Sequence, residues 1–183
     1  MNIREIDPAA EQSLLDSVID LRVQCWAPQT PVPLTRDDLV DPTDEIARHW
    51  VAIADGKLVG AARLSTHDSL DDMPDTACML GVFTDPPPSP IGFLSRLVVA
   101  PAYRRRGLGS MLDEIRIRAA EQSGCRSLLG LVFEASGEAR LSQLIALGFA
   151  VRGRGRKDTH PTFSSLPAPL VVERAMFPRN NGT

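Results

Sequence analysis

The sequence predicts a single α/β domain, and three features indicate this fold class. Two strand-like runs, His49–Ala54 and Lys57–Leu64, flank Asp55-Gly56, a pair that accepts the positive φ angles of a two-residue hairpin turn. An apolar strand, Phe93–Ala100, is followed closely by an amphipathic helix, Gly107–Ser123. No internal repeat or linker divides the 183 residues, so residues 1–183 are expected to form one domain.

The N-terminal part is expected to begin with a helix. Asp7 has the side chain of an N-cap, and Pro8 suits the first helical position, where its missing N–H costs nothing. The apolar stripe of this helix consists of Leu14, Leu15, Val18, Leu21 and Cys25. Pro28 ends it, and Thr35 with Asp38 resembles a capping box that opens a short second helix or turn.

The remaining elements alternate between loops, helices and strands. Residues 68–75 form an acidic loop, a short helix is expected over 75–82, and the proline-rich stretch 85–90 is an extended connector. The helix Gly107–Ser123 is expected to bury Leu108, Met111, Leu112, Ile115 and Ala119, with its charges on the other face and a stop at Gly124. The last elements are expected to be strand Leu128–Phe133, helix Ser136–Leu147, and strands Phe149–Arg154 and Leu170–Phe177.

Composition and charge narrow the classes of ligand. The net charge of −3 argues against nucleic-acid binding, while the basic segments Arg104–Arg106 and Arg152–Lys157 favour a small anionic ligand. No signal pattern and no membrane-spanning run of about 20 apolar residues is present, so we expect a cytoplasmic protein without membrane contact. Three dispersed cysteines indicate buried free thiols and no metal site.

The most informative segment joins the apolar strand to the amphipathic helix. Its sequence, Arg104-Arg105-Arg106-Gly107-Leu108-Gly109-Ser110, places three guanidinium groups and two glycines at a helix N-terminus. Unpaired N–H groups and the helix dipole attract anions there, glycines let the backbone approach a ligand, and arginines suit phosphate oxygens. Neither the Walker sequence nor the dinucleotide fingerprint fits, so this loop predicts a pyrophosphate site.

This segment resembles the coenzyme A signature of the GNAT acetyltransferases. The match is Arg104-x-x-Gly107-x-Gly109, preceded by Leu97-Val98-Val99-Ala100-Pro101-x-Tyr103. Leu144–Phe149 is similar to the closing helix and Leu-Gly-Phe turn of that family, and the order of elements agrees from about residue 3 to residue 177.

The resemblance implies a GNAT fold: a mixed, mostly antiparallel sheet of about six to seven strands with splayed central strands and about four flanking helices. It also implies acetyl-CoA as co-substrate and no metal. The residues expected to bind the cofactor are Leu97, Val98, Val99, Arg104, Arg105, Arg106, Gly107, Leu108, Gly109 and Ser110. The acyl group would pass to a primary amine of a small molecule or peptide by direct transfer in a ternary complex.

The catalytic residues depart from the family pattern. The tyrosine that often protonates the leaving sulfur is replaced by Leu144, and the single tyrosine, Tyr103, lies before the loop. A thiol with a pKa near 8.5 is nevertheless a fair leaving group. Glu134, at the end of a strand, and His160, in the loop before the last strand, are the candidate general bases.

Two other interpretations stay open. Leu21-Arg22-x-x-x-Trp26, Asp41-x-x-Asp44, Gly60-x-x-Arg63-Leu64 and Ser95-Arg96-Leu97 resemble the layout of acyl-homoserine-lactone and N-acyl-amino-acid synthases. Those enzymes take long acyl groups from acyl-CoA or acyl carrier protein. A coenzyme A-binding domain without turnover is the second alternative. The family often forms dimers, so a homodimer is a possible assembly.

Overall fold

The structure is a computed structural model, and it describes residues 1–133, 137–157 and 166–176. Its main elements are β1 (Asn2–Ile6), α1 (Gln12–Trp26), α2 (Thr43–Ile46), β2 (Arg48–Ala54), β3 (Lys57–His67), β4 (Ile91–Val99), α3 (Leu108–Gln122), β5 (Ser127–Val132), α4 (Gly137–Ala146), β6 (Ala150–Arg154) and β7 (Leu170–Ala175). Short 3₁₀ turns lie at Ala27–Gln29, Asp37–Leu39, Thr76–Met79 and Pro101–Tyr103. The predicted α/β fold is confirmed.

One seven-stranded sheet runs through the molecule in the order β1-β2-β3-β4-β5-β7-β6. All neighbouring strands are antiparallel except β4 and β5, which are parallel. The β2–β3 hairpin turns at Asp55 and Gly56, whose φ angles of 51° and 71° are those that the sequence predicted. This hairpin therefore forms from local pairing, whereas β1 and β4 reach its two edges from distant parts of the sequence.

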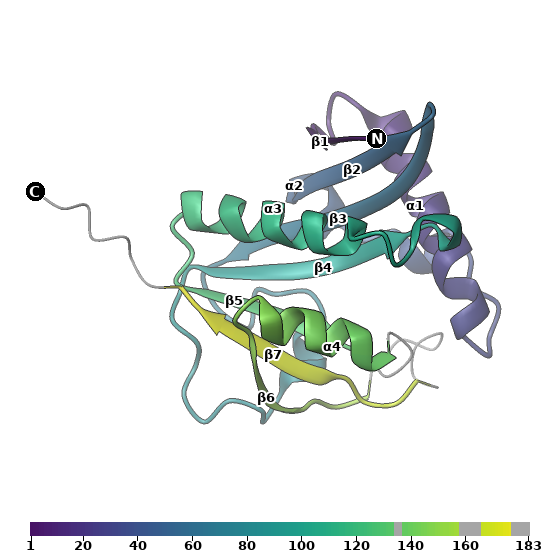
Figure 1. Ribbon diagram of the computed structural model, residues 1–183. Coiled ribbons are helices and arrows are strands. Elements are labelled where there is room, and N and C mark those ends of the chain that lie inside the picture. Colours follow the sequence, from purple (N-terminus) through teal and green to yellow (C-terminus); the bar gives the residue numbers. More distant parts are fainter. Residues whose placement is uncertain (134–136, 158–165, 177–183) are drawn as a thin grey trace, which may run out of the picture.

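The parallel pair separates halfway along its length. Residues 91–94 of β4 pair with residues 127–130 of β5, but β4 continues to Val99 without a partner on that side. The register between β3 and β4 shifts at the same point, and Arg96 there has a φ angle of 54°, as in a β-bulge. The expected splay between the central strands is confirmed, and Figure 1 shows β4 and β5 diverging.

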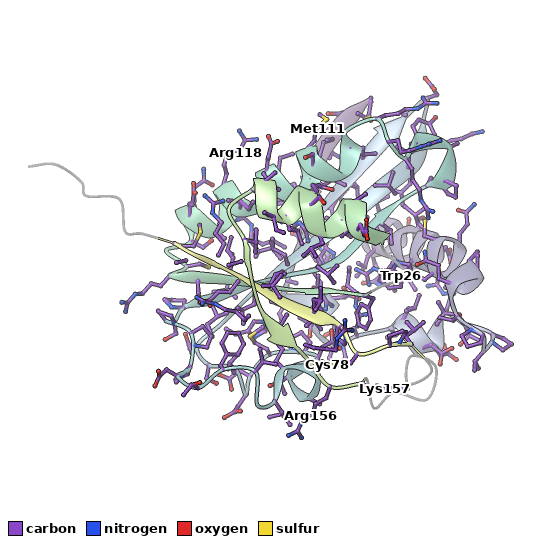
Figure 2. The ribbon with its side chains drawn as sticks, turned by 60° about the horizontal axis from the view of Figure 1, so that its bottom comes forward. Trp26, Cys78, Met111, Arg118, Arg156 and Lys157 are labelled. Carbon is purple, nitrogen blue, oxygen red and sulfur yellow. The ribbon has the colours of Figure 1, made fainter. Side chains whose placement is uncertain are left out.

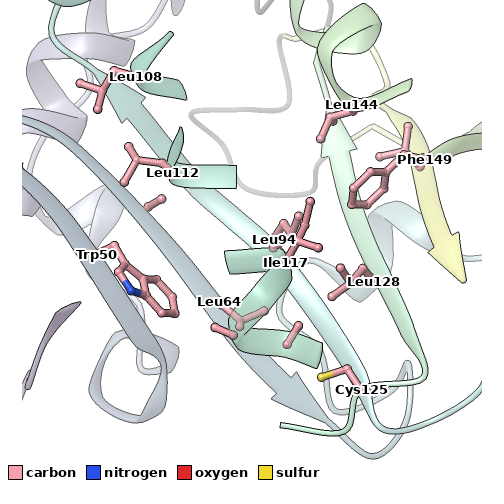
Figure 3. Packing of buried hydrophobic residues seen from close by; sticks show 14 of the residues in the cluster. Trp50, Leu64, Leu94, Leu108, Leu112, Ile117, Cys125, Leu128, Leu144 and Phe149 are labelled. Atoms are coloured by element: carbon pink, nitrogen blue, oxygen red, sulfur yellow. The ribbon is translucent and has the colours of Figure 1, made fainter. Parts of the chain in front are cut away.

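Helices cover both faces of the sheet because successive residues of a strand point to opposite sides. Trp50 and Ala52 of β2 pack in one core with α3 and α4, whereas Val51 packs in a second core with α1. In Figure 1, α3 lies along β4 and α4 lies over β5 and β7. Figure 3 shows side chains of α3, the strands and α4 meeting in the larger core. The two helices over this face thus flank the splay.

Two predictions about helices are wrong. The first helix begins at Gln12 and not at Pro8, because the Asp7 carboxylate accepts the N–H of Ala9 and closes a separate turn. The charges of α3 do not all face solvent: Asp113 and Arg116 are fully buried, whereas the expected core residue Met111 is 43% exposed. Figure 2 shows Met111 and Arg118 on the outer side of α3.

Candidate cofactor and acceptor site

The helix α3 opens with an uncapped N-terminus. Gly107 is its N-cap with a φ angle of 79°, and no side chain caps the helix there. The first helical bond runs from the N–H of Met111 to the carbonyl of Gly107 at 3.0 Å. The N–H groups of residues 108–110 have no partner within the helix, as at any helix start. Such N–H groups are the donors on which the predicted anion site depends.

The two glycines of the loop serve different purposes. A side chain at Gly107 would strain the backbone, since its φ angle of 79° lies in the left-handed region. A methyl group at Gly109 would meet only ordinary contacts, to Gln143 and Leu97 side-chain atoms at 3.9 Å. Gly107 therefore shapes the turn, whereas Gly109 leaves space beside the helix start.

A cavity of about 850 Å³ lies in the splay. One wall is β4 from Phe93 to Val99, and the opposite wall includes Leu131, Phe133 and residues of α4. Among the predicted cofactor residues, those lining the cavity are Leu97, Val98, Val99, Arg104, Arg105, Gly107, Leu108, Gly109 and Ser110. The structure thus brings nine of the ten predicted residues to one cavity.

The three loop arginines take different positions. Arg104 lines the cavity and its Nε donates to the carbonyl of Val99 at 3.0 Å, while Arg105 lines the cavity with a φ angle of 59°. Arg106 is not among the lining residues. Its guanidinium lies over the ring of Tyr103, at 5.4 Å from the ring centroid. The tyrosine thus packs against the loop.

A buried ionic cluster lies at the end of the cavity that is farther from the glycine loop. Asp44 accepts two hydrogen bonds from Arg22, at 2.6 and 2.9 Å, and one from Arg63 at 3.0 Å. Arg63 also pairs with Asp41 at 2.8 Å, and Asp41 accepts from Arg96 at 3.1 Å. Arg22 and Arg63 are fully buried, whereas Asp41 and Arg96 line the cavity. The four segments whose sequences resemble the acyl-homoserine-lactone synthases are therefore joined by ion pairs.

This cluster fixes the charges of its members. Burial alone would raise the pKa of Asp41, but Arg63 and Arg96 outweigh it and hold the pKa well below its ordinary value. Burial lowers the pKa of His49 to about 4, and its Nε2 lies 3.0 Å from the carbonyl oxygen of Asp44. His49 is therefore neutral at pH 7 and donates to that carbonyl, which makes it a structural residue.

The candidate bases Glu134 and His160 lie outside the described residues. Leu144, which stands where the family resemblance leads us to expect a tyrosine, is buried in the core at 2% exposure. Sequence reasoning missed two residues of α4, Arg140 and Gln143, which line the cavity. No signal in the sequence indicated them, because the helical pattern placed Asp113, the carboxylate that binds both, on the solvent face of its helix.

Within the described residues, no group of three or more His, Cys, Asp or Glu side chains is placed to hold a metal ion. No helix in the described part of the chain has both the length and the apolar character needed to cross a membrane. Cys25, Cys78 and Cys125 are buried and are not joined in disulfides, as the sequence predicted.

Comparison with solved structures shows the same fold in many proteins. The ribosomal-protein-S18-alanine N-acetyltransferase of Escherichia coli has a TM-score of 0.66 and 20% identity, covering 100% of this chain and 99% of its own. An acyl-CoA N-acyltransferase of Pseudomonas aeruginosa has a TM-score of 0.65 and 18% identity, covering 96% and 100%. The GNAT-like decarboxylase GphF, solved with isobutyryl-CoA, has a TM-score of 0.67 and 22% identity, covering 96% and 99%.

Comparison with curated protein sequences gave no match. The model of the acetyltransferase (GNAT) family matches residues 15–149, a stretch that begins within α1 and ends after α4. It includes the splay, the glycine loop and the Leu-Gly-Phe turn, which are the features that carried the resemblance in the sequence. The chain therefore belongs to the GNAT acetyltransferase family.

Proposed function

We propose that this protein is an N-acyltransferase that moves an acetyl or short acyl group from acyl-CoA to a primary amine in a ternary complex. One observation carries the proposal: a single cavity runs from the glycine loop along the splayed half of β4 to the segments around Asp41 and Asp75. Such a cavity accommodates a long donor that enters at the loop and an acceptor that enters from the opposite end.

The charges of the lining support this orientation. Among the described residues, Tyr103–Ser110 and α4 contribute the cations Arg104, Arg105 and Arg140 to the lining and no acid. The lining acids Asp37, Asp38, Asp41 and Asp75 come from the segments near the other end, where they outnumber the lining cation Arg96. The positive end and the helix N-terminus suit the phosphates of acyl-CoA. The acidic end suits an acceptor that carries positive charge.

Direct transfer needs few groups from the protein. The neutral amine attacks the thioester carbon, the carbonyl oxygen becomes negatively charged, and the bond to sulfur then breaks. The amine must lose a proton, for which Glu134 and His160 remain the candidates. Because Leu144 has no proton to give, the leaving thiolate takes its proton from water, which a thiol pKa near 8.5 permits.

A thiol-release assay tests the proposal. Acetyl-CoA would be incubated with a panel of amines, including diamines, aminoglycosides, amino acids and lysine peptides, and free thiol measured against time. The proposal predicts release that depends on one class of amine and saturates with it. Saturable binding of CoA without acceptor-dependent release from any donor or amine would contradict it and favour a domain that binds CoA without turnover.

A second candidate function rests on the buried ionic cluster. Arg22, Asp41, Asp44, Arg63 and Arg96 come from four separate segments and form one network, as expected if their resemblance to signal synthases reflects a shared acceptor site. In that case the preferred donor would carry a long acyl chain on CoA or on acyl carrier protein. A comparison of kcat/KM for acetyl-CoA, decanoyl-CoA and decanoyl acyl carrier protein distinguishes the two functions.

A further inference from the structure

A second buried ionic cluster, distinct from the one around Asp44, joins α3 to α4 beside the glycine loop. The Asp113 carboxylate lies at its centre and accepts hydrogen bonds from Arg116 on its own helix and from Arg140 on α4. The side-chain amide of Gln143 donates to the same carboxylate at 2.7 Å. Asp113 therefore fixes the positions of two α4 side chains that line the cavity.

The cluster carries an excess of positive charge. It holds one carboxylate and two guanidinium groups, and Arg116, Asp113 and Arg140 interact electrostatically with one another. Arg116 is fully buried, and its NH1 donates to the carbonyls of Arg63 at 2.9 Å and Ser95 at 3.1 Å. Because an unbalanced buried charge is costly, this arrangement favours an additional anion.

The excess charge reaches the cavity at Arg140. Its side chain is 18% exposed and is a lining residue, whereas Asp113 and Arg116 are 0% exposed. Arg140 and Gln143 donate to the same oxygen of Asp113, so their polar ends are neighbours. Gln143 in turn lies 3.9 Å from the position that a Cβ atom on Gly109 would take. The guanidinium of Arg140 is therefore close to the start of α3.

We propose that Arg140 is a second anion-binding residue of the cavity, which donates to a phosphate oxygen of acyl-CoA, and that Asp113 is its positioning residue. This inference rests on the proposed function, because it assumes that acyl-CoA enters at the glycine loop. The backbone N–H groups of residues 108–110 then bind the diphosphate from one side and Arg140 binds it from the side of α4. A planar guanidinium held by a carboxylate is already oriented for such a bond.

The test combines Arg140→Gln with donors that contain or lack the diphosphate. Loss of one charged hydrogen bond is expected to raise the Kd of CoA, measured by calorimetry, by about tenfold or more. It is expected to lower kcat/KM for acetyl-CoA by a similar factor through KM and to leave kcat/KM for acetyl-pantetheine unchanged. Arg118→Gln removes the same charge from the exposed side of α3 and serves as the control (Figure 2).

The results distinguish an error in the role of Arg140 from an error in the proposed function. Unchanged Kd of CoA in Arg140→Gln, or equal losses for acetyl-CoA and acetyl-pantetheine, would overturn the role of Arg140. Failure of the unaltered protein to bind CoA would instead overturn the proposed function. If Arg140→Gln does not fold, as judged by circular dichroism, Arg140→Lys keeps the charge beside Asp113 but loses the guanidinium fork. It is expected to fold and to show a smaller rise in Kd, and a wild-type Kd in Arg140→Lys would then count against the proposal.

Discussion

Gly109 allows stability and binding to be changed in opposite directions. In Gly109→Asp, the new side chain has space, because the nearest side-chain atoms lie 3.9 Å from the position of its Cβ. A carboxylate in the first turn of α3 interacts favourably with the helix dipole, by about 0.3–1 kcal/mol. The folded protein is therefore expected to keep or slightly gain stability, while its affinity for acyl-CoA falls.

The loss of affinity follows from Coulomb's law. A diphosphate held by the N–H groups of residues 108–110 would place two negative charges about 6 Å from the new carboxylate. Their repulsion is about 1.4 kcal/mol in a fully water-like medium and about 5.5 kcal/mol at the effective dielectric of a protein surface. The Kd of CoA is therefore expected to rise by at least about tenfold, and by less at high salt.

Calorimetry with CoA and thermal unfolding measure the two effects separately. Gly109→Ala is the matched control, because it adds the same Cβ without charge and is expected to bind CoA within a few-fold of the unaltered protein. Equally tight binding of CoA by Gly109→Asp and Gly109→Ala would show that no phosphate lies beside residue 109. An equal loss in both variants would also contradict the prediction, since crowding and not charge would then be the cause.

Three further predictions concern the buried ionic cluster around Asp44 and the candidate base Glu134. Burial lowers the pKa of His49 from 6.5 to about 4, so below pH 6.5 the unfolded chain binds a proton that the folded chain does not. The free energy of unfolding should thus fall between pH 6.5 and pH 4, by up to about 3 kcal/mol, and urea titrations of His49→Gln should lack this slope. Asp44→Asn leaves the fully buried Arg22 without its counter-charge and should cost about 3–5 kcal/mol in urea unfolding. Glu134→Gln should lower the acyl-transfer rate at neutral pH if Glu134 is the base, and an unaltered pH–rate profile would remove it from consideration.

Controls for the stability predictions come from the exposed surface. Glu5 pairs with Arg48 at 2.7 Å, but the side chain of Glu5 is 42% exposed and that of Arg48 is 38% exposed. Removing that pair by Glu5→Gln should change the free energy of unfolding by less than about 1 kcal/mol. A loss in Asp44→Asn no larger than that in Glu5→Gln would contradict the structural role given to the buried cluster.

Local patterns in the sequence were sufficient for much of the fold and for the conformation of the glycine loop. Asp55-Gly56 specifies its own turn, and the glycine loop specifies a helix N-terminus, because both depend on the backbone preferences of a few adjacent residues. The same holds for Gly148, whose φ angle of 87° ends the segment after α4. Features of this kind need no knowledge of distant contacts.

Contacts between distant segments could not be predicted in the same way. The helical pattern of α3 assigned Asp113 and Arg116 to solvent, because periodicity alone places charged residues on the outside. Their burial depends on Arg140, which is 27 residues from Asp113 in sequence, and on the carbonyl of Ser95 at the bulge in β4. The predicted start of the N-terminal helix at Pro8 is too early for a related reason. Arg4 binds Glu11 at 2.6 Å and stabilises a turn that precedes α1.

A crystal structure of the protein with CoA would show whether the start of α3 binds the diphosphate. We expect diphosphate oxygens within about 3.2 Å of the backbone nitrogens of residues 108–110, with the pantetheine arm in the splay beside Leu97 and Val98. CoA bound elsewhere, with these N–H groups covered by protein or free of phosphate, would contradict this expectation.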